Sequence, residues 1–164
     1  RRLADLLTRL SGIRHLRRLR IHTRLPVVEP ARLTPRLRDW LTDNPWQTLL
    51  VLHANHGREI APALTEGLEP LRRAGVTLLN QAVLLRGVND DPDVLAALSE
   101  RLFAAGVLPY YLHLLDPVAG AAHFEVPEDR ARTLHQQLRA RLPGYLVPRL
   151  VREDPGEAAK TLLA

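Results

Sequence analysis

Four apolar runs, spaced by about 30 residues, constrain the fold more than any other feature of this sequence. They begin near residues 18, 48, 76 and 108, and the run TLLVLHA at residues 48–54 is typical of a strand buried on both faces. The intervals between the runs carry helical periodicity, which predicts parallel strands joined by helical crossovers. We therefore expect an α/β fold of about four βα units, as part of a (β/α) barrel or as an open parallel sheet.

Helix signals separate these runs. Thr34 followed by Pro35 is typical of a helix start, and Gly75 and Gly106 suit the C-terminal caps of two helices. The leucine spacing of residues 3–10 predicts an amphipathic helix, and further helices are predicted at about residues 58–74, before Gly106, and at about 127–142. Residues 145–153 are predicted to be extended. The sequence contains no linker-like stretch, so residues 1–164 are predicted to form one domain or part of one.

The composition excludes several classes of protein. With 46% hydrophobic residues the chain can bury an ordinary core, and it lacks an apolar run long enough to cross a bilayer and a signal peptide, so we expect a cytoplasmic protein. The absence of cysteine excludes disulfides and thiolate-bound metals within these residues. Because the chain begins at Arg1 and contains no methionine, we expect it to be a fragment.

A formal net charge of +5 would permit binding to nucleic acid. The arginines are nevertheless spread along the chain, with the densest group at residues 14–20, and few aromatic side chains are available to stack on bases. A charged face exposed to water explains this pattern more simply. A non-catalytic basic α/β domain that binds RNA or a translation partner remains the alternative, as does a (β/α) barrel enzyme that uses no iron.

Polar residues stand at the predicted carboxyl ends of the strands, where parallel α/β folds bind their ligands. His53 and His56 have a poor spacing for a metal site, and we predict none. The two amides of Asn80 and Gln81 need partners inside an apolar run, either a ligand or an internal network. Asp116 follows an apolar strand and could hold a cation at the rim or cap a loop.

Lys160 is the one lysine among 23 lysine and arginine residues. A lysine amine can lose its proton and form a Schiff base with a carbonyl group, whereas a guanidinium stays charged and cannot. Most lysines are solvated and inert, so an unremarkable surface residue is the competing interpretation.

Five blocks in fixed order give the chain a family resemblance: RIHTRLPVV, HANHGREI, LLNQAVLLRGVND, PYYLHLLDPVAGAAHF and GYLVPRLVREDPGEAAKT. They resemble the second half of the lysine 2,3-aminomutase family, radical S-adenosylmethionine enzymes that also use pyridoxal 5'-phosphate. The block around residues 110–124 is most similar to the branch that supplies (R)-β-lysine for modification of elongation factor P. The resemblance implies that residues 1–164 are the C-terminal part of a radical S-adenosylmethionine barrel, ending in the pyridoxal phosphate lysine segment at residues 143–164.

The resemblance also assigns roles to particular residues. Lys160 matches the family's pyridoxal phosphate lysine, in the block formed by Pro155, Gly156, Lys160 and Thr161. Asp116 and Glu153 match two acidic residues that hold the side-chain ammonium of the substrate, although free-lysine enzymes have Asp at the second position.

Three further residues, His53, Asn55 and Gln81, match positions that line the cofactor region. Asp91 stands where free-lysine enzymes have a zinc-ligand cysteine, so that interface zinc is not expected.

The implied activity is the conversion of L-lysine to (R)-β-lysine by a radical 1,2-amino shift. A [4Fe-4S] cluster would cleave S-adenosylmethionine to start the reaction, and pyridoxal phosphate would stabilise the migrating group. The cluster needs cysteines, which these residues lack, so we expect its ligands to lie outside the fragment and the fragment alone to be inactive.

Overall fold

The computed structural model describes residues 2–164, which form one six-stranded sheet with the strands in chain order. The five parallel strands are β1 (Arg18–Thr23), β2 (Gln47–Leu52), β3 (Thr77–Val83), β4 (Leu108–His113) and β5 (Arg149–Arg152). The short strand β6 (Thr161–Leu162) then pairs antiparallel with β5. The expectation of parallel βα units is confirmed, and the antiparallel β6 is an addition that the sequence pattern did not indicate.

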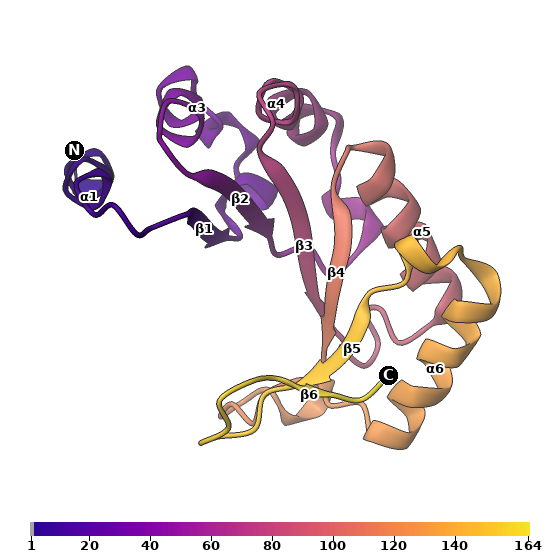
Figure 1. Cartoon of the computed structure of the whole chain (residues 1–164). Coiled ribbons are helices and arrows are strands. Elements are labelled where there is room, and N and C mark those ends of the chain that lie inside the picture. Colours follow the sequence, from indigo (N-terminus) through magenta and orange to yellow (C-terminus); the bar gives the residue numbers. More distant parts are fainter. Residues whose placement is uncertain (1) are drawn as a thin grey trace.

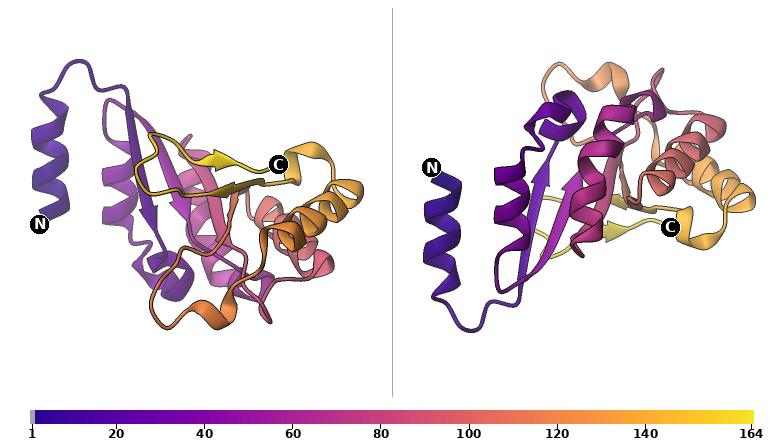
Figure 2. Two further views of the ribbon diagram at one scale, coloured as in Figure 1. Left: turned by 90° about the horizontal axis from the view of Figure 1, so that it is seen from below. Right: turned by 90° about the horizontal axis from the view of Figure 1, so that it is seen from above.

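The helices lie along one face of this sheet (Figure 1). They are α1 (Arg2–Ser11), α2 (Leu25–Val28), α3 (Pro35–Thr42), α4 (Pro62–Arg73), α5 (Pro92–Ala104) and α6 (Glu128–Arg141). Short 3₁₀ turns occupy Pro30–Arg32, Gly57–Glu59, Ala122–Phe124 and Gly144–Leu146. In Figure 2 the helices stand in a row on one side of the strands, and the C-terminal segment crosses the other side, which we call the open face. This is the arrangement of part of a (β/α) barrel.

The predicted helix ends are mostly confirmed. The Thr34 hydroxyl accepts a hydrogen bond from the Leu37 N–H at 3.2 Å, so it caps α3. Gly75 and Gly106 have φ angles of 84° and 75°, which suit glycine at the end of a helix. The helix predicted from residue 58 was wrong at its start: α4 begins at Pro62, because residues 57–59 form a 3₁₀ turn after His56.

The hydrophobic core lies between the sheet and its helices. Its largest fully buried side chains are all leucines, at positions 41, 50, 52, 64, 68, 71, 84, 102, 112, 134, 138 and 150. Burial of each leucine contributes about 1.5–3 kcal/mol relative to exposure. Among residues 2–164, none of the helices combines the length and the hydrophobicity that crossing a lipid bilayer requires.

Two candidate residues lie in loops just after their strands. β2 ends at Leu52, earlier than the predicted run of residues 48–54, so His53 lies in the following loop. β4 ends at His113 and Asp116 follows it, as expected. Both therefore lie at the carboxyl edge of the parallel sheet, where this class of fold binds ligands.

Candidate functional site

The site is built on the open face of the sheet. Successive side chains of a strand point to opposite faces, so Asn80 and Gln81 separate although they are neighbours in the sequence. Asn80 is 2% exposed and lies in the core, where its side chain bonds the backbone N–H and C=O of Ala54 at 2.9 and 3.0 Å. Of the two alternatives for this amide pair, the internal network therefore holds for Asn80, and Gln81 remains a candidate to meet a ligand.

A β-bulge in β4 positions Tyr111, the aromatic residue of the site. Asn80 pairs with Pro109 but Gln81 pairs with Tyr111, so β4 contributes one extra residue at this point. Pro109 cannot donate to the ladder, which favours an irregularity here. The Tyr111 ring lies edge-on to His113, with ring centroids 5.7 Å apart.

Lys160 is brought to this face by the segment between β5 and β6. Asp154 closes the segment, because its carboxylate accepts from Arg152 Nε at 2.7 Å and from Thr161 Oγ1 at 2.5 Å. These two contacts lower the pKa of Asp154, with Arg152 as the larger cause. Gly156, with a φ of 89°, makes a turn that other residues rarely adopt. The chain can thus cross the open face and return as β6.

The Lys160 amine lies among site residues instead of in bulk solvent. Its side chain is 29% exposed, its Nζ donates to Glu153 Oε1, and the same atom lies 5.7 Å from the centroid of the Tyr111 ring. A cavity of about 350 Å³ opens beside it, lined by Arg20, Tyr111, Glu153, Asp154, Glu157, Ala158, Ala159 and Lys160. These contacts place Lys160 beside other candidate residues, and its role in binding a cofactor stays a prediction.

His113 lies behind Lys160 and Glu153. It is 6% exposed, its Nδ1 lies 4.0 Å from Glu153 Oε1, and its Nε2 has no hydrogen-bond partner within the part of the chain that the structure describes. Burial, followed by the positive charge of Lys160, lowers the pKa of His113 to about 4, while Asp116 acts in the opposite direction. His113 is therefore a neutral imidazole at neutral pH, with an unused ring nitrogen beside the candidate amine.

Two more histidines extend the site toward β1. The rings of His22 and His53 meet edge-on with centroids 5.8 Å apart, and Arg24 donates to the backbone oxygen of His53 at 3.1 Å. Burial is the main cause that lowers the pKa of both rings. For His22 the nearby Gln81 side chain partly opposes this effect, while the positive charge of Lys160 adds to it. His22, Gln81 and Lys160 are thus neighbours, although β1, β3 and the C-terminal segment are far apart in sequence.

Asn55 has a structural contact of its own. Its side-chain oxygen accepts from the Val83 N–H at 2.9 Å, and its backbone oxygen accepts from Asn89 Nδ2 at 2.8 Å. These bonds fix the loop after β2 against the end of β3. Whether Asn55 also contacts a cofactor stays a prediction, as it does for His53 and Gln81.

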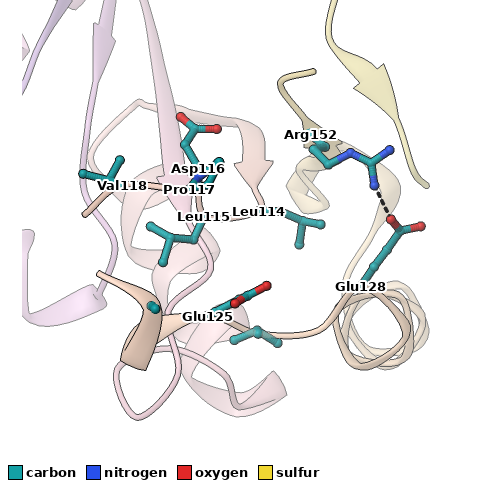
Figure 3. Close-up of a pocket in the computed structure, with 10 residues that line it drawn as sticks. Leu114, Leu115, Asp116, Pro117, Val118, Glu125, Glu128 and Arg152 are labelled. Carbon is teal, nitrogen blue, oxygen red and sulfur yellow. Dashed lines mark hydrogen bonds and ion pairs between the residues drawn. The ribbon is translucent and has the colours of Figure 1, made fainter. Parts of the chain in front are cut away.

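Asp116 lies on the loop after β4, close enough to His113 for its charge to influence the pKa of that ring. The same loop lines a second cavity of about 440 Å³, whose walls include Leu114, Leu115, Asp116, Val118 and Val126 (Figure 3). Across this cavity Arg152 pairs with Glu128, the first residue of α6. The charges of Asp116 and Lys160 thus both reach His113 and shift its pKa in opposite directions.

The side chains at Lys160 include an amine that could bind a carbonyl group, and they do not suit an iron–sulfur cluster. The cavity at Lys160 combines an amine, the guanidinium of Arg20 and the aromatic face of Tyr111, and the unpartnered Nε2 of buried His113 is nearby. The chain has no cysteine to supply thiolate ligands. In residues 2–164 there is also no group of three or more His, Asp or Glu side chains placed to hold a metal ion.

Sequence reasoning missed Tyr111 and Arg20, and it gave His113 no role. The period-2 alternation of β4 could have identified His113, because it places that residue on the face opposite Leu112. The bulge that turns Tyr111 toward Lys160 could not be read from the local pattern.

Curated relatives share the sequence along almost the whole chain. It is 54% identical over 158 residues to the L-lysine 2,3-aminomutase of Escherichia coli (strain K12), covering 96% of this chain and 46% of that protein. It is 50% identical over 162 residues to the L-lysine 2,3-aminomutase of Haemophilus influenzae, covering 99% and 48%. A more distant protein of the same name, from Clostridium subterminale, is 39% identical over 156 residues, covering 95% and 37%. The chain thus spans about half the length, or less, of these relatives.

Solved structures support the fold. A radical SAM methyltransferase from Sphaerobacter thermophilus has a TM-score of 0.55 at 21% identity and covers 71% of this chain and 37% of that one. A domain of pyruvate-formate lyase-activating enzyme from Bacteroides vulgatus has a TM-score of 0.59 at 16% identity, covering 93% and 92%. No protein-family model matches the chain.

Proposed function

We propose that this chain carries the pyridoxal phosphate site of a lysine 2,3-aminomutase. Nearly all of its length is similar to about half the length of each of three curated L-lysine 2,3-aminomutases. The observation that carries the proposal is the position of Lys160, on the open face of the sheet beside Tyr111 and next to the buried His113. The sequence identity with the curated relatives supports the reaction class.

The side chains of the site would have different roles in binding the cofactor. The amine of Lys160 would bind the aldehyde, the Tyr111 ring would form one wall for the cofactor ring, and Arg20 would offer positive charge to the phosphate. When bound, pyridoxal phosphate supplies the conjugated imine that makes a 1,2-amino shift accessible to a radical. The neutral His113 would present a hydrogen-bonding nitrogen without placing a second positive charge beside the amine.

The substrate's side-chain ammonium would be held by carboxylates at the other side of the site. Asp116, on the loop after β4, is the nearer of the two candidates to the cavity of Figure 3. Glu153 is the second, and the structure shows it paired with Lys160. Oppositely charged groups attract each other more strongly where water is excluded.

The proposal extends to the parts of the reaction that this chain does not supply. A [4Fe-4S] cluster and S-adenosylmethionine would provide the radical, with cluster ligands on residues beyond the 164 of this sequence, which contain no cysteine. The product, (R)-β-lysine, would be used in the modification of elongation factor P. The support for this use is the resemblance of residues 110–124 to the branch of the family that supplies it.

The test uses the complete protein that contains this chain. Pyridoxal phosphate is added, the imine is reduced with borohydride, and the modified peptide is identified by mass spectrometry. We expect the adduct on Lys160 and its absence in Lys160→Arg, a control that keeps the positive charge but cannot form the imine. Conversion of L-lysine to β-lysine is measured by chromatography in parallel. Salt-sensitive RNA binding without any adduct would favour a basic binding domain instead.

A further inference from the structure

Glu153 forms an ion pair with Lys160. Its Oε1 accepts from Lys160 Nζ, and the same oxygen lies 4.0 Å from Nδ1 of His113. The Glu153 side chain is 53% exposed and that of Lys160 is 29% exposed, so the pair lies at the water-facing mouth of the site, in front of the buried imidazole.

The other nearby carboxylates have different partners. Asp154 is held by Arg152 and Thr161, and Glu128 by Arg132 and Arg152. Glu157 lines the same cavity as Lys160 but is exposed, and the ion pair that the structure gives to Lys160 is with Glu153. The contact is therefore selective among the acidic residues of this region.

We propose that Glu153 is the resting partner of Lys160: it holds the free amine as an ammonium and is released when that amine becomes bonded to a carbonyl ligand. The inference rests on the proposed function, in that the ligand is an aldehyde. Glu153 would thus be a positioning residue that restrains the amine of Lys160. Binding of the aldehyde would release the Glu153 carboxylate, which could then bind the substrate.

The chemistry balances without a further reactant. The ammonium R–NH₃⁺ and the aldehyde O=CH–R′ give the protonated imine R–NH⁺=CH–R′ and one water molecule. The nitrogen must first lose a proton to attack the carbonyl carbon, and that proton returns when the oxygen leaves as water. The imine nitrogen keeps the positive charge but only one N–H where the ammonium had three, so its interaction with Glu153 is weaker and the carboxylate becomes available to a second cation.

The released carboxylate would lie beside His113, a ring that the charge of Asp116 also reaches. A cationic side chain arriving at Asp116 could then use Glu153 as its second partner. Because one carboxylate serves first Lys160 and then the substrate, the aldehyde must be in place before the substrate's ammonium can be held by both acids.

The experiment compares the reactivity of Lys160 in the complete protein, purified without pyridoxal phosphate. Wild type, Glu153→Gln and the control Glu100→Gln are treated at pH 7 with acetic anhydride, or with pyridoxal phosphate followed by borohydride. The labelling rate of Lys160 is measured by peptide mass spectrometry. Because exposed ion pairs contribute up to about 1 kcal/mol, we expect about two- to five-fold faster labelling by both reagents in Glu153→Gln. Glu100→Gln, on the exposed face of α5, should match wild type.

The two reagents separate the possible failures. If acetylation responds to Glu153→Gln but wild type forms no pyridoxal phosphate adduct, the pairing is correct and the proposed cofactor is wrong. If the adduct forms on Lys160 at equal rates in wild type and Glu153→Gln, the resting-partner role is refuted. Slower labelling in Glu153→Gln would also refute it, since Glu153 would then assist the amine instead of restraining it. Far-UV circular dichroism of each variant shows that the fold is kept.

Discussion

Protonation of His113 is predicted to destabilise the protein at acidic pH. The ring is 6% exposed and lies near the positive charge of Lys160, which together hold its pKa at about 4 against an ordinary value of 6.5. The unfolded chain therefore binds a proton at His113 at a higher pH than the folded chain does. The resulting stabilisation is complete above about pH 6.5 and is lost as the pH falls toward 4.

The magnitude follows from the size of the shift. A fall in pKa from 6.5 to about 4 corresponds to roughly 3 kcal/mol, because one pKa unit is about 1.4 kcal/mol. Most of this, about 2.5 kcal/mol, should be lost between pH 7.5 and pH 4.5.

The assay is urea unfolding of the complete protein at pH 7.5 and pH 4.5, for wild type and His113→Gln. Glutamine keeps a hydrogen-bonding group of similar size but does not titrate. The loss of unfolding free energy between the two pH values should be about 2 kcal/mol smaller in the variant. Equal losses in both proteins would refute the argument, as would an NMR titration in which His113 protonates near pH 6.5.

Three further predictions concern stability and are measured by urea unfolding of the same protein. Asn80→Ala should cost about 2–4 kcal/mol, because it leaves the buried N–H and C=O of Ala54 without partners; a cost below 1 kcal/mol would mean that water replaces the amide. Asp91→Ala should cost about 1 kcal/mol, since the Asp91 side chain caps α5 by accepting from the N–H groups of Asp93 and Val94; an Asp91→Asn control should recover most of the loss. Leu134→Ala, in the core face of α6, should cost about 2–5 kcal/mol, and an unchanged midpoint would contradict its full burial.

The role of Asp91 shows how a local signal and a family resemblance can answer different questions. The resemblance drew attention to this position because the free-lysine enzymes that the chain resembles have a zinc-ligand cysteine there. The structure gives Asp91 a role of its own, at the start of α5, where its carboxylate accepts two backbone N–H groups at 2.8 and 3.2 Å. An N-cap of this kind can be predicted from Asp91 followed by Pro92, since the cap needs neighbouring residues alone.

The site residues were less predictable because their grouping depends on the sheet. His22, Gln81 and Lys160 come from β1, β3 and the C-terminal segment, and no local spacing relates them. The neighbours Asn80 and Gln81 looked alike in the sequence, yet the pleat sends one into the core and the other to the open face. The residue pattern singled out Gln81, Asp116 and Lys160, and the family resemblance added Glu153, but neither indicated that Glu153 contacts Lys160.

The C-terminal segment was the least predictable part of the fold. β6 is two residues long, too short to show any periodicity, and it forms by pairing with Val151 and Arg152. Its position depends on Asp154, whose contacts with Arg152 and Thr161 close the segment. A prediction from local pattern cannot weigh such contacts.

The sequence by itself determined the order of the parallel strands and the main helices and several of the helix caps, because periodicity and capping depend on residues a few positions apart. It also marked Lys160 as chemically distinct from the arginines. Only the tertiary structure decided that this amine meets Glu153 in front of His113. The reason is physical: the pairing of β6 and the bulge in β4 bring together charges and rings from distant segments, and their energies arise only once the sheet has formed.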